Sequence, residues 1–179
     1  MKHTATLLLL AGLPLATMQA QADKAPRLEK TAIGSSGCSA YLPVKMPEFE
    51  LTYSEDNAEV YTASMDIDSF TFGCIAVKFA EPFTDSDPDD MEELLMSYMD
   101  YLKEAFEITG SAGYGRGHTL EAYPDARGVL DYWEDAQHTQ YKVMGWVNQN
   151  NLGFLYVSGP KDYPFANLQD MYLNGWRFE

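Results

Sequence analysis

Apolar residues recur along this chain at two spacings, which alternate in blocks. Up to residue 80 and again after residue 113, short runs rich in aromatic and β-branched residues are separated by turn-forming residues, a pattern typical of β-strands. Between these blocks the apolar residues recur every three or four positions, as on one face of a helix. The first block comprises four predicted strands, at 38–43, 49–53, 58–65 and 70–80. The pattern therefore predicts strands, a helix and strands again.

The predicted central helix spans about 88–108 and has clear signals at its start. Asp87 is placed to cap the first turn, and Pro88 suits the first helical position, where no N–H is needed. A second amphipathic helix is expected at about 164–175, where Gly175 is placed to end it.

The second strand block contains four runs joined by short turns, so consecutive strands are expected to be antiparallel neighbours. These runs lie near 114–123, 127–135, 139–148 and 152–158. The fold class is therefore α+β, an antiparallel meander sheet of about six to eight strands flanked by two main helices. The strand at 70–80 is apolar on both alternating faces, which requires cover on both sides of the sheet.

The first 22 residues have the pattern of an export signal. Lys2 precedes an apolar run, and Ala20-Gln21-Ala22 offers the small residues that a signal peptidase accepts. The apolar run is about half of the roughly 20 residues that a membrane-spanning helix needs. We therefore expect cleavage near Ala22, a periplasmic or secreted location, and a soluble protein without stable membrane insertion.

Removal of residues 1–22 leaves 157 of the 179 residues, which is enough for one well-buried core. Residues 23–37 are polar and end in Gly-Ser-Ser-Gly, so they are expected to be flexible, with a single α+β domain at 38–179. Because exported proteins fold under oxidising conditions, Cys38 and Cys74, the only cysteines, are expected to form a structural disulfide.

The formal net charge of −15 limits the classes of partner. Such a surface repels nucleic acid and anionic lipid, which are bound chiefly by Lys and Arg. The expected partner is a protein, or a neutral or cationic ligand, and no cofactor is predicted apart from one weak calcium alternative.

That alternative lies in the acidic run before the central helix. Asp85, Asp87 and Asp89 occupy the first, third and fifth positions of a calcium-binding loop. The match then fails, because position six is Asp90 where glycine is needed, and position twelve is Met96 where a glutamate should close the site. Helix capping and a solvated acidic face are the preferred interpretation.

Aromatic residues gather in the second strand block. Tyr132 and Trp133 are adjacent in one predicted strand and must point to opposite faces, and Trp146 lies in the next. If helices cover both faces, these rings belong to the core; if one face is open, they form a platform for a sugar, a peptide or a cationic partner. Arg116, in a glycine-rich connection, is a candidate contact for an anion.

Two histidines, His118 and His138, follow the predicted leader and lie at the ends of different predicted strands. A hydrolase built on either would need partners supplied by the fold, such as Glu134 or Asp135. Two carboxylates facing each other across a cleft would be another hydrolytic arrangement.

The predicted elements run from the first strand Cys38–Pro43 through the long helix and the meander from Gly128 to Val157 to the closing helix from Phe165 to Trp176. This order resembles that of the PsbP-like domains, which are exported or lumenal modules. The resemblance implies an antiparallel sheet flanked by helices. Members of that group include accessory and scaffolding proteins, and the resemblance transfers no active site.

These features predict an exported, soluble, non-enzymatic accessory or binding module. An inhibitor or immunity-type protein that neutralises a cationic partner is one form of it. The alternatives are a small secreted hydrolase that uses carboxylates or a histidine, and a weak calcium-binding protein.

Overall fold

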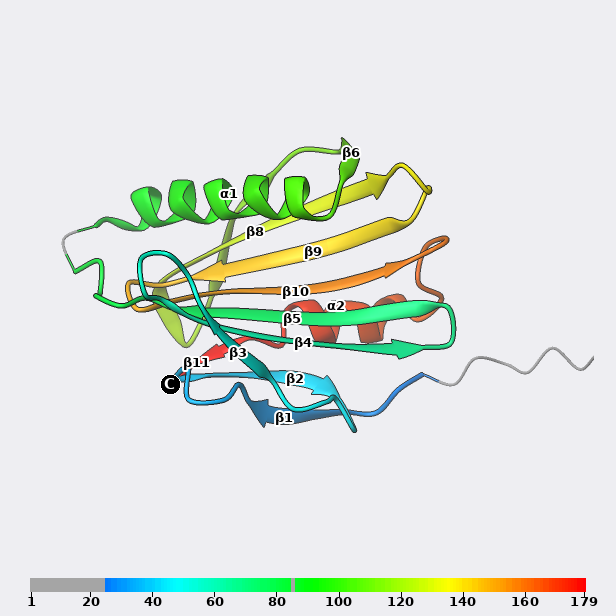
Figure 1. The fold of residues 1–179 in the computed structure, drawn as a ribbon, viewed down its shortest axis with the longest axis horizontal. Coiled ribbons are helices and arrows are strands. Elements are labelled where there is room, and N and C mark those ends of the chain that lie inside the picture. The colour runs from blue at the N-terminus through cyan, green and yellow to red at the C-terminus, as the bar shows by residue number, and fades with distance from the viewer. Residues whose placement is uncertain (1–24, 85) are drawn as a thin grey trace, which may run out of the picture.

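The structure is a computed structural model that describes residues 25–84 and 86–179. The predicted leader therefore lies outside the described residues. Within them, the chain forms two antiparallel sheets and two helices (Figure 1).

The larger sheet has eight strands in the order β3-β4-β5-β10-β9-β8-β6, with β7 also pairing with β8. Its strands are β3 (Glu50–Tyr53), β4 (Glu59–Ile67), β5 (Phe70–Lys78), β6 (Ile108–Ser111), β7 (Gly115–Leu120), β8 (Tyr123–Asp135), β9 (Gln140–Val147) and β10 (Asn151–Gly159). The smaller sheet has the order β1-β2-β11, formed by β1 (Leu28–Ala32), β2 (Cys38–Pro43) and β11 (Arg177–Phe178).

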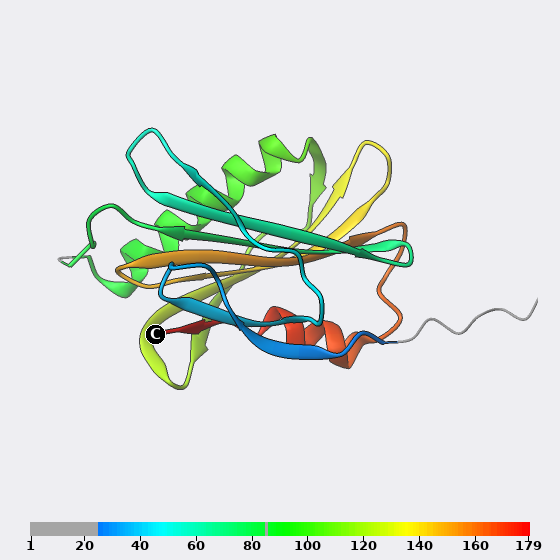
Figure 2. The same ribbon diagram turned by 60° about the horizontal axis from the view of Figure 1, so that its bottom comes forward.

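The two helices, α1 (Pro88–Ala105) and α2 (Ala166–Leu173), lie on opposite sides of the larger sheet (Figure 2). The predicted start of α1 is confirmed, because the Asp87 carboxylate accepts hydrogen bonds of 2.9 Å from the backbone N–H groups of Asp89 and Asp90. Neither described helix is long and apolar enough to cross a membrane.

Two hydrophobic cores form, one on each face of the larger sheet. The first lies between that sheet, α2 and the smaller sheet, and the second lies beneath α1. Strand β5 contributes Phe72, Cys74 and Ala76 to the first core and Val77 to the second. The prediction that the strand beginning at Phe70 needs cover on both sides is therefore confirmed.

The α+β class and the two helices agree with the sequence-based prediction, as does the run of antiparallel neighbours β7 to β10. The expectation of one meander sheet is wrong, because Cys38–Pro43 belongs to a second sheet. Strands β1, β6 and β11 were not expected. Strand β1 lies within the segment 23–37, so that segment is not flexible throughout; it pairs residue by residue with β2.

The unexpected strands are short and mostly polar, so nothing in their own pattern marks them. β1 has no buried residue, and β11 has only two residues. Each is a strand because β2 or β8 offers an unpaired edge beside it, and backbone groups near the core must be hydrogen-bonded.

Candidate functional site

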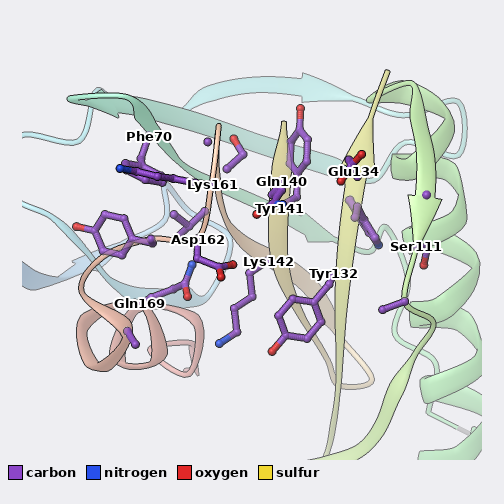
Figure 3. Close-up of a pocket in the computed structure, with 18 of the residues that line it drawn as sticks. Phe70, Ser111, Tyr132, Glu134, Gln140, Tyr141, Lys142, Lys161, Asp162 and Gln169 are labelled. Atoms are coloured by element: carbon purple, nitrogen blue, oxygen red, sulfur yellow. The ribbon is translucent and has the colours of Figure 1, made fainter. Parts of the chain in front are cut away.

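An open groove of about 760 Å³ lies on the α2 side of the larger sheet (Figure 3). Strands β8, β9 and β10 form its floor. Its walls come from β6, from the segment 161–163 that follows β10, and from α2.

The floor is built from cross-strand rows of side chains. Its two rows are Tyr132–Lys142–Val157 and Glu134–Gln140–Gly159. On the same face, the preceding row is Leu130–Met144–Leu155, and its members pack in or against the first core. The face therefore changes from apolar to mostly polar along the strands, at the point where the core beneath α2 and the smaller sheet ends.

Tyr132 is the large aromatic side chain exposed on this floor, with 48% of its surface accessible. Lys142, its cross-strand neighbour, holds its Nζ 5.6 Å from the centre of the Tyr132 ring. The same Nζ lies 2.8 Å from Asp170 Oδ1 on α2. Burial by itself would lower the pKa of Lys142, but the interactions with Asp170 and Tyr132 together outweigh it and the pKa is raised. Lys142 therefore stays charged and ties the floor to the helix.

The groove is electrically balanced although the chain is strongly acidic. Its charged lining residues are Glu134, Asp162, Lys142 and Lys161, two of each sign. The chain as a whole has a formal charge of −15. The groove therefore has no net charge with which to select a charged ligand.

A buried ionic cluster lies behind the floor, on the α1 side of β8. Asp131 is fully buried and accepts hydrogen bonds from Trp133 Nε1 at 2.7 Å and from Ser111 Oγ at 2.8 Å. Lys103 of α1 places its Nζ 3.0 Å from the same Asp131 oxygen. Burial lowers the pKa of Lys103, but hydrogen bonds to Tyr114 and Asp131 outweigh it, so the pKa is raised. This cluster joins β6, β8 and α1 and holds Ser111 at the groove wall.

The four residues predicted as a possible binding surface do not form one surface. Tyr132 lies on the groove floor, whereas Trp133 and Trp146 are 2% and 1% exposed and belong to opposite cores. Arg116, on β7, places its Nε 2.6 Å from Glu92 Oε2 and so connects β7 to α1. The two indoles belong to the core, as expected if helices cover both faces of the sheet. Tyr132 lies on an open face, as expected if one face is left uncovered.

The candidate calcium ligands are not seen together. Asp85 lies outside the described residues, and the Asp87 carboxylate is engaged at the start of α1. In the part of the chain that the structure describes, no three metal-ligating His, Cys, Asp or Glu side chains gather.

Cys38 and Cys74 lie in the first core and come from different sheets. Both are buried, and they are not bonded to each other in the structure. Burial raises the pKa of Cys38 to about 12, and it raises that of Cys74 as well. Both are therefore neutral thiols when reduced at neutral pH, and the disulfide between them stays a prediction.

The two histidines lie apart. His138, in the turn between β8 and β9, has its Nδ1 2.7 Å from Glu134 Oε1, and this hydrogen bond raises its pKa. It lines a second hollow of about 320 Å³ that meets the groove at Ser158 and Gly159. His118, on β7, lines neither hollow.

The sequence did not predict Gln140, Lys142 or Gln169 as site residues, although all three line the groove. A signal was present in β9, where Gln140 and Lys142 are followed at the same spacing of two by Met144 and Trp146. One face of that strand thus changes from polar to apolar along its length, which indicates partial cover. No such signal marks Gln169, because only the position of α2 brings it to the groove.

Neither a known protein family nor a curated protein matches this chain. The functional interpretation therefore rests on the geometry of the groove and on the residues that line it.

Proposed function

We propose that the chain is an exported, non-enzymatic accessory or binding module, and that it holds its partner in the groove beside α2. The observation that carries this proposal is the position of Tyr132, an exposed aromatic side chain on the polar floor of a concave surface. The groove volume of about 760 Å³ falls within the range of ligand sites, roughly 300–1,000 Å³. An aromatic ring with a hydroxyl group suits such a surface because it offers both apolar area and a hydrogen bond.

The groove side chains are also held in place, which favours recognition. Lys142 is tied to Asp170, and Glu134 is tied to His138. Side chains that are ordered before binding lose less conformational entropy when a ligand arrives. The likeness of the element order to PsbP-like domains, whose members include accessory proteins, supports the same proposal.

The test compares two exposed tyrosines. The mature protein and its Tyr132→Ala and Tyr101→Ala variants are immobilised and exposed to an extract of the exported fraction. Tyr101, on α1, is 67% exposed and does not line the groove, so it is the matched control. Tyr132→Ala should lose the bound partner, and Tyr101→Ala should retain it. Equal capture by all three proteins would remove the groove as the binding site.

The inhibitor or immunity form of the proposal makes a further demand on the same experiment. A cationic partner that is seated in the groove and also contacts the acidic surface around it should be captured at low salt and released at high salt, because exposed charges are screened. Capture that does not change with salt would argue against this form.

A hydrolase is the second candidate, and one observation favours it. Glu134 of the groove forms a pair with His138 of the adjoining second hollow, and a carboxylate on one histidine nitrogen is the arrangement that orients a general base. Against this, the His138 side chain is 85% exposed, so water is not excluded around it. If the protein is a hydrolase, the wild type should cleave chromogenic esters or glycosides and His138→Ala should not. A wild type that turns over no substrate of such a panel would count against the hydrolase.

A further inference from the structure

The chemistry of the groove restricts its ligand beyond the general proposal of a binding site. Its four charged side chains balance, and two of them, Lys142 and Glu134, already have oppositely charged or ionisable neighbours. Charged ligands are selected by a complementary electrostatic potential, and the balanced charges of the groove do not provide one. The ligand that fits is polar but neutral.

The floor also restricts how a ligand is recognised. Strands β8, β9 and β10 are internal strands of the larger sheet, so each is paired on both sides. Their backbone N–H and C=O groups are used between strands, and an extended peptide cannot add to the floor as another strand. Recognition at the floor must come from side chains.

The side chains on the floor and wall of the groove combine an aromatic ring with amide groups. Tyr132 offers exposed aromatic surface, while Gln140 on the floor and Gln169 on the wall offer amide groups that both donate and accept hydrogen bonds. Lys142, fixed by Asp170, borders the Tyr132 ring and limits where it moves. Figure 3 shows Tyr132 and Lys142 next to each other, with Gln169 on the α2 side of Lys142.

We infer that the groove binds a neutral oligosaccharide, with one sugar ring stacked on Tyr132 and its hydroxyl groups bonded to Gln140 and Gln169. A sugar ring has an apolar C–H face and a rim of hydroxyl groups that both donate and accept, so it matches this combination of an aromatic surface and amides. The volume of about 760 Å³ is large enough for a few sugar rings. This inference rests on the proposed function, because it names the ligand class of the same groove.

The experiment is calorimetric titration of the full mature protein with three neutral hexasaccharides, built of β-1,4-linked glucose, β-1,4-linked N-acetylglucosamine and α-1,4-linked glucose. An acidic oligogalacturonide is the charged comparison. At least one neutral probe should bind, more tightly than the acidic one, and its affinity should change little between low and high salt because no ion pair is formed.

The variants locate the site. Tyr132→Ala should weaken binding about tenfold, which corresponds to about 1.4 kcal/mol, and Gln169→Ala should also weaken it. Tyr132→Phe retains the ring and should bind nearly as wild type does. Tyr101→Ala, on α1, should not change the affinity. Circular dichroism of every variant checks that a loss of binding is not a loss of fold.

Two results overturn the inference: no neutral hexasaccharide binds at millimolar concentration, or Tyr132→Ala binds one as tightly as wild type. These failures differ from a failure of the proposed function. If Tyr132→Ala still loses a captured partner from the extract, the groove remains a binding site with a different ligand. If neither sugars nor extract components depend on Tyr132, both proposals fall.

Discussion

Lys103 has two carboxylate partners in very different surroundings, and this difference yields a quantitative prediction. Asp131 is fully buried and lies 3.0 Å from Lys103 Nζ, whereas Asp100 is 66% exposed at its side chain and lies 3.5 Å away. Replacing Asp131 with alanine leaves the Lys103 charge and the Trp133 N–H without their buried acceptor. Replacing Asp100 leaves both with Asp131 in place.

The expected costs follow from burial. Removing one partner of a buried ion pair costs about 3–5 kcal/mol, because the remaining charge is desolvated without compensation. The Lys103 side chain is 17% exposed, so the lower part of that range is expected for Asp131→Ala. The exposed pair contributes at most about 1 kcal/mol. Asp100→Ala also removes the exposed hydrogen bond from the Tyr114 hydroxyl, so about 2 kcal/mol is the limit expected for that variant.

The assay is urea unfolding followed by tryptophan fluorescence, since all three tryptophans lie in the two cores. Asp131→Ala should shift the midpoint strongly without changing the slope, and it should lower the melting temperature by roughly 6–16 °C. Lys103→Met combined with Asp131→Ala should cost less than the sum of the two changes, because no unpaired charge remains. Equal costs for Asp131→Ala and Asp100→Ala would contradict this prediction, because burial would then not decide the strength of the pair.

Two further predictions concern the cysteines and the histidine beside the groove. Protein from an oxidising compartment should contain a disulfide bond between Cys38 and Cys74. Closing the 37-residue segment 38–74 contributes about 4 kcal/mol to the free energy of unfolding, so reduction should lower the melting temperature. Mass spectrometry that finds two free thiols would contradict this prediction. The pKa of His138 is raised by its hydrogen bond to Glu134, so protonated His138 stabilises the folded state. This contribution is complete below the pKa of about 6.5 in the unfolded chain and is lost as the pH rises through the pKa in the folded protein. An NMR titration should show a lower pKa for His138 in Glu134→Gln, and an unchanged value would mean that Glu134 does not cause the shift.

The elements that could be predicted are those with strong local signals. The start of α1 is encoded by Asp87 and Pro88, and its core face by apolar residues three and four apart. The hairpins from β7 to β10 follow from short turns between alternating runs, because a short turn leaves consecutive strands only an antiparallel pairing. The helix was predicted to end three residues late because Phe106 continues the apolar spacing, although its side chain packs against Trp133 from the end of the helix.

The candidate site could be predicted only in part. The alternation in β8 showed that Tyr132 and Trp133 face opposite ways, but both are large aromatic residues, and nothing local says which face is covered. Trp133 is buried because α1 lies over it, and Tyr132 is exposed because the first core ends one row earlier on the other face. A cross-strand row such as the groove floor is made of side chains from three strands that are separate in the chain. The hydrophobic pattern within one strand therefore does not reveal it.

Local signals along the chain are enough to predict the α+β class, the helix α1 and the order of the antiparallel hairpins, because caps, turns and periodicity act between residues that are near each other in the chain. Long-range packing is needed to make Cys38–Pro43 part of a second sheet, to pair β1 and β11 with it, and to place the groove where the first core ends. Those outcomes depend on which edges and faces remain uncovered after distant segments have packed, and no single stretch of sequence contains that information.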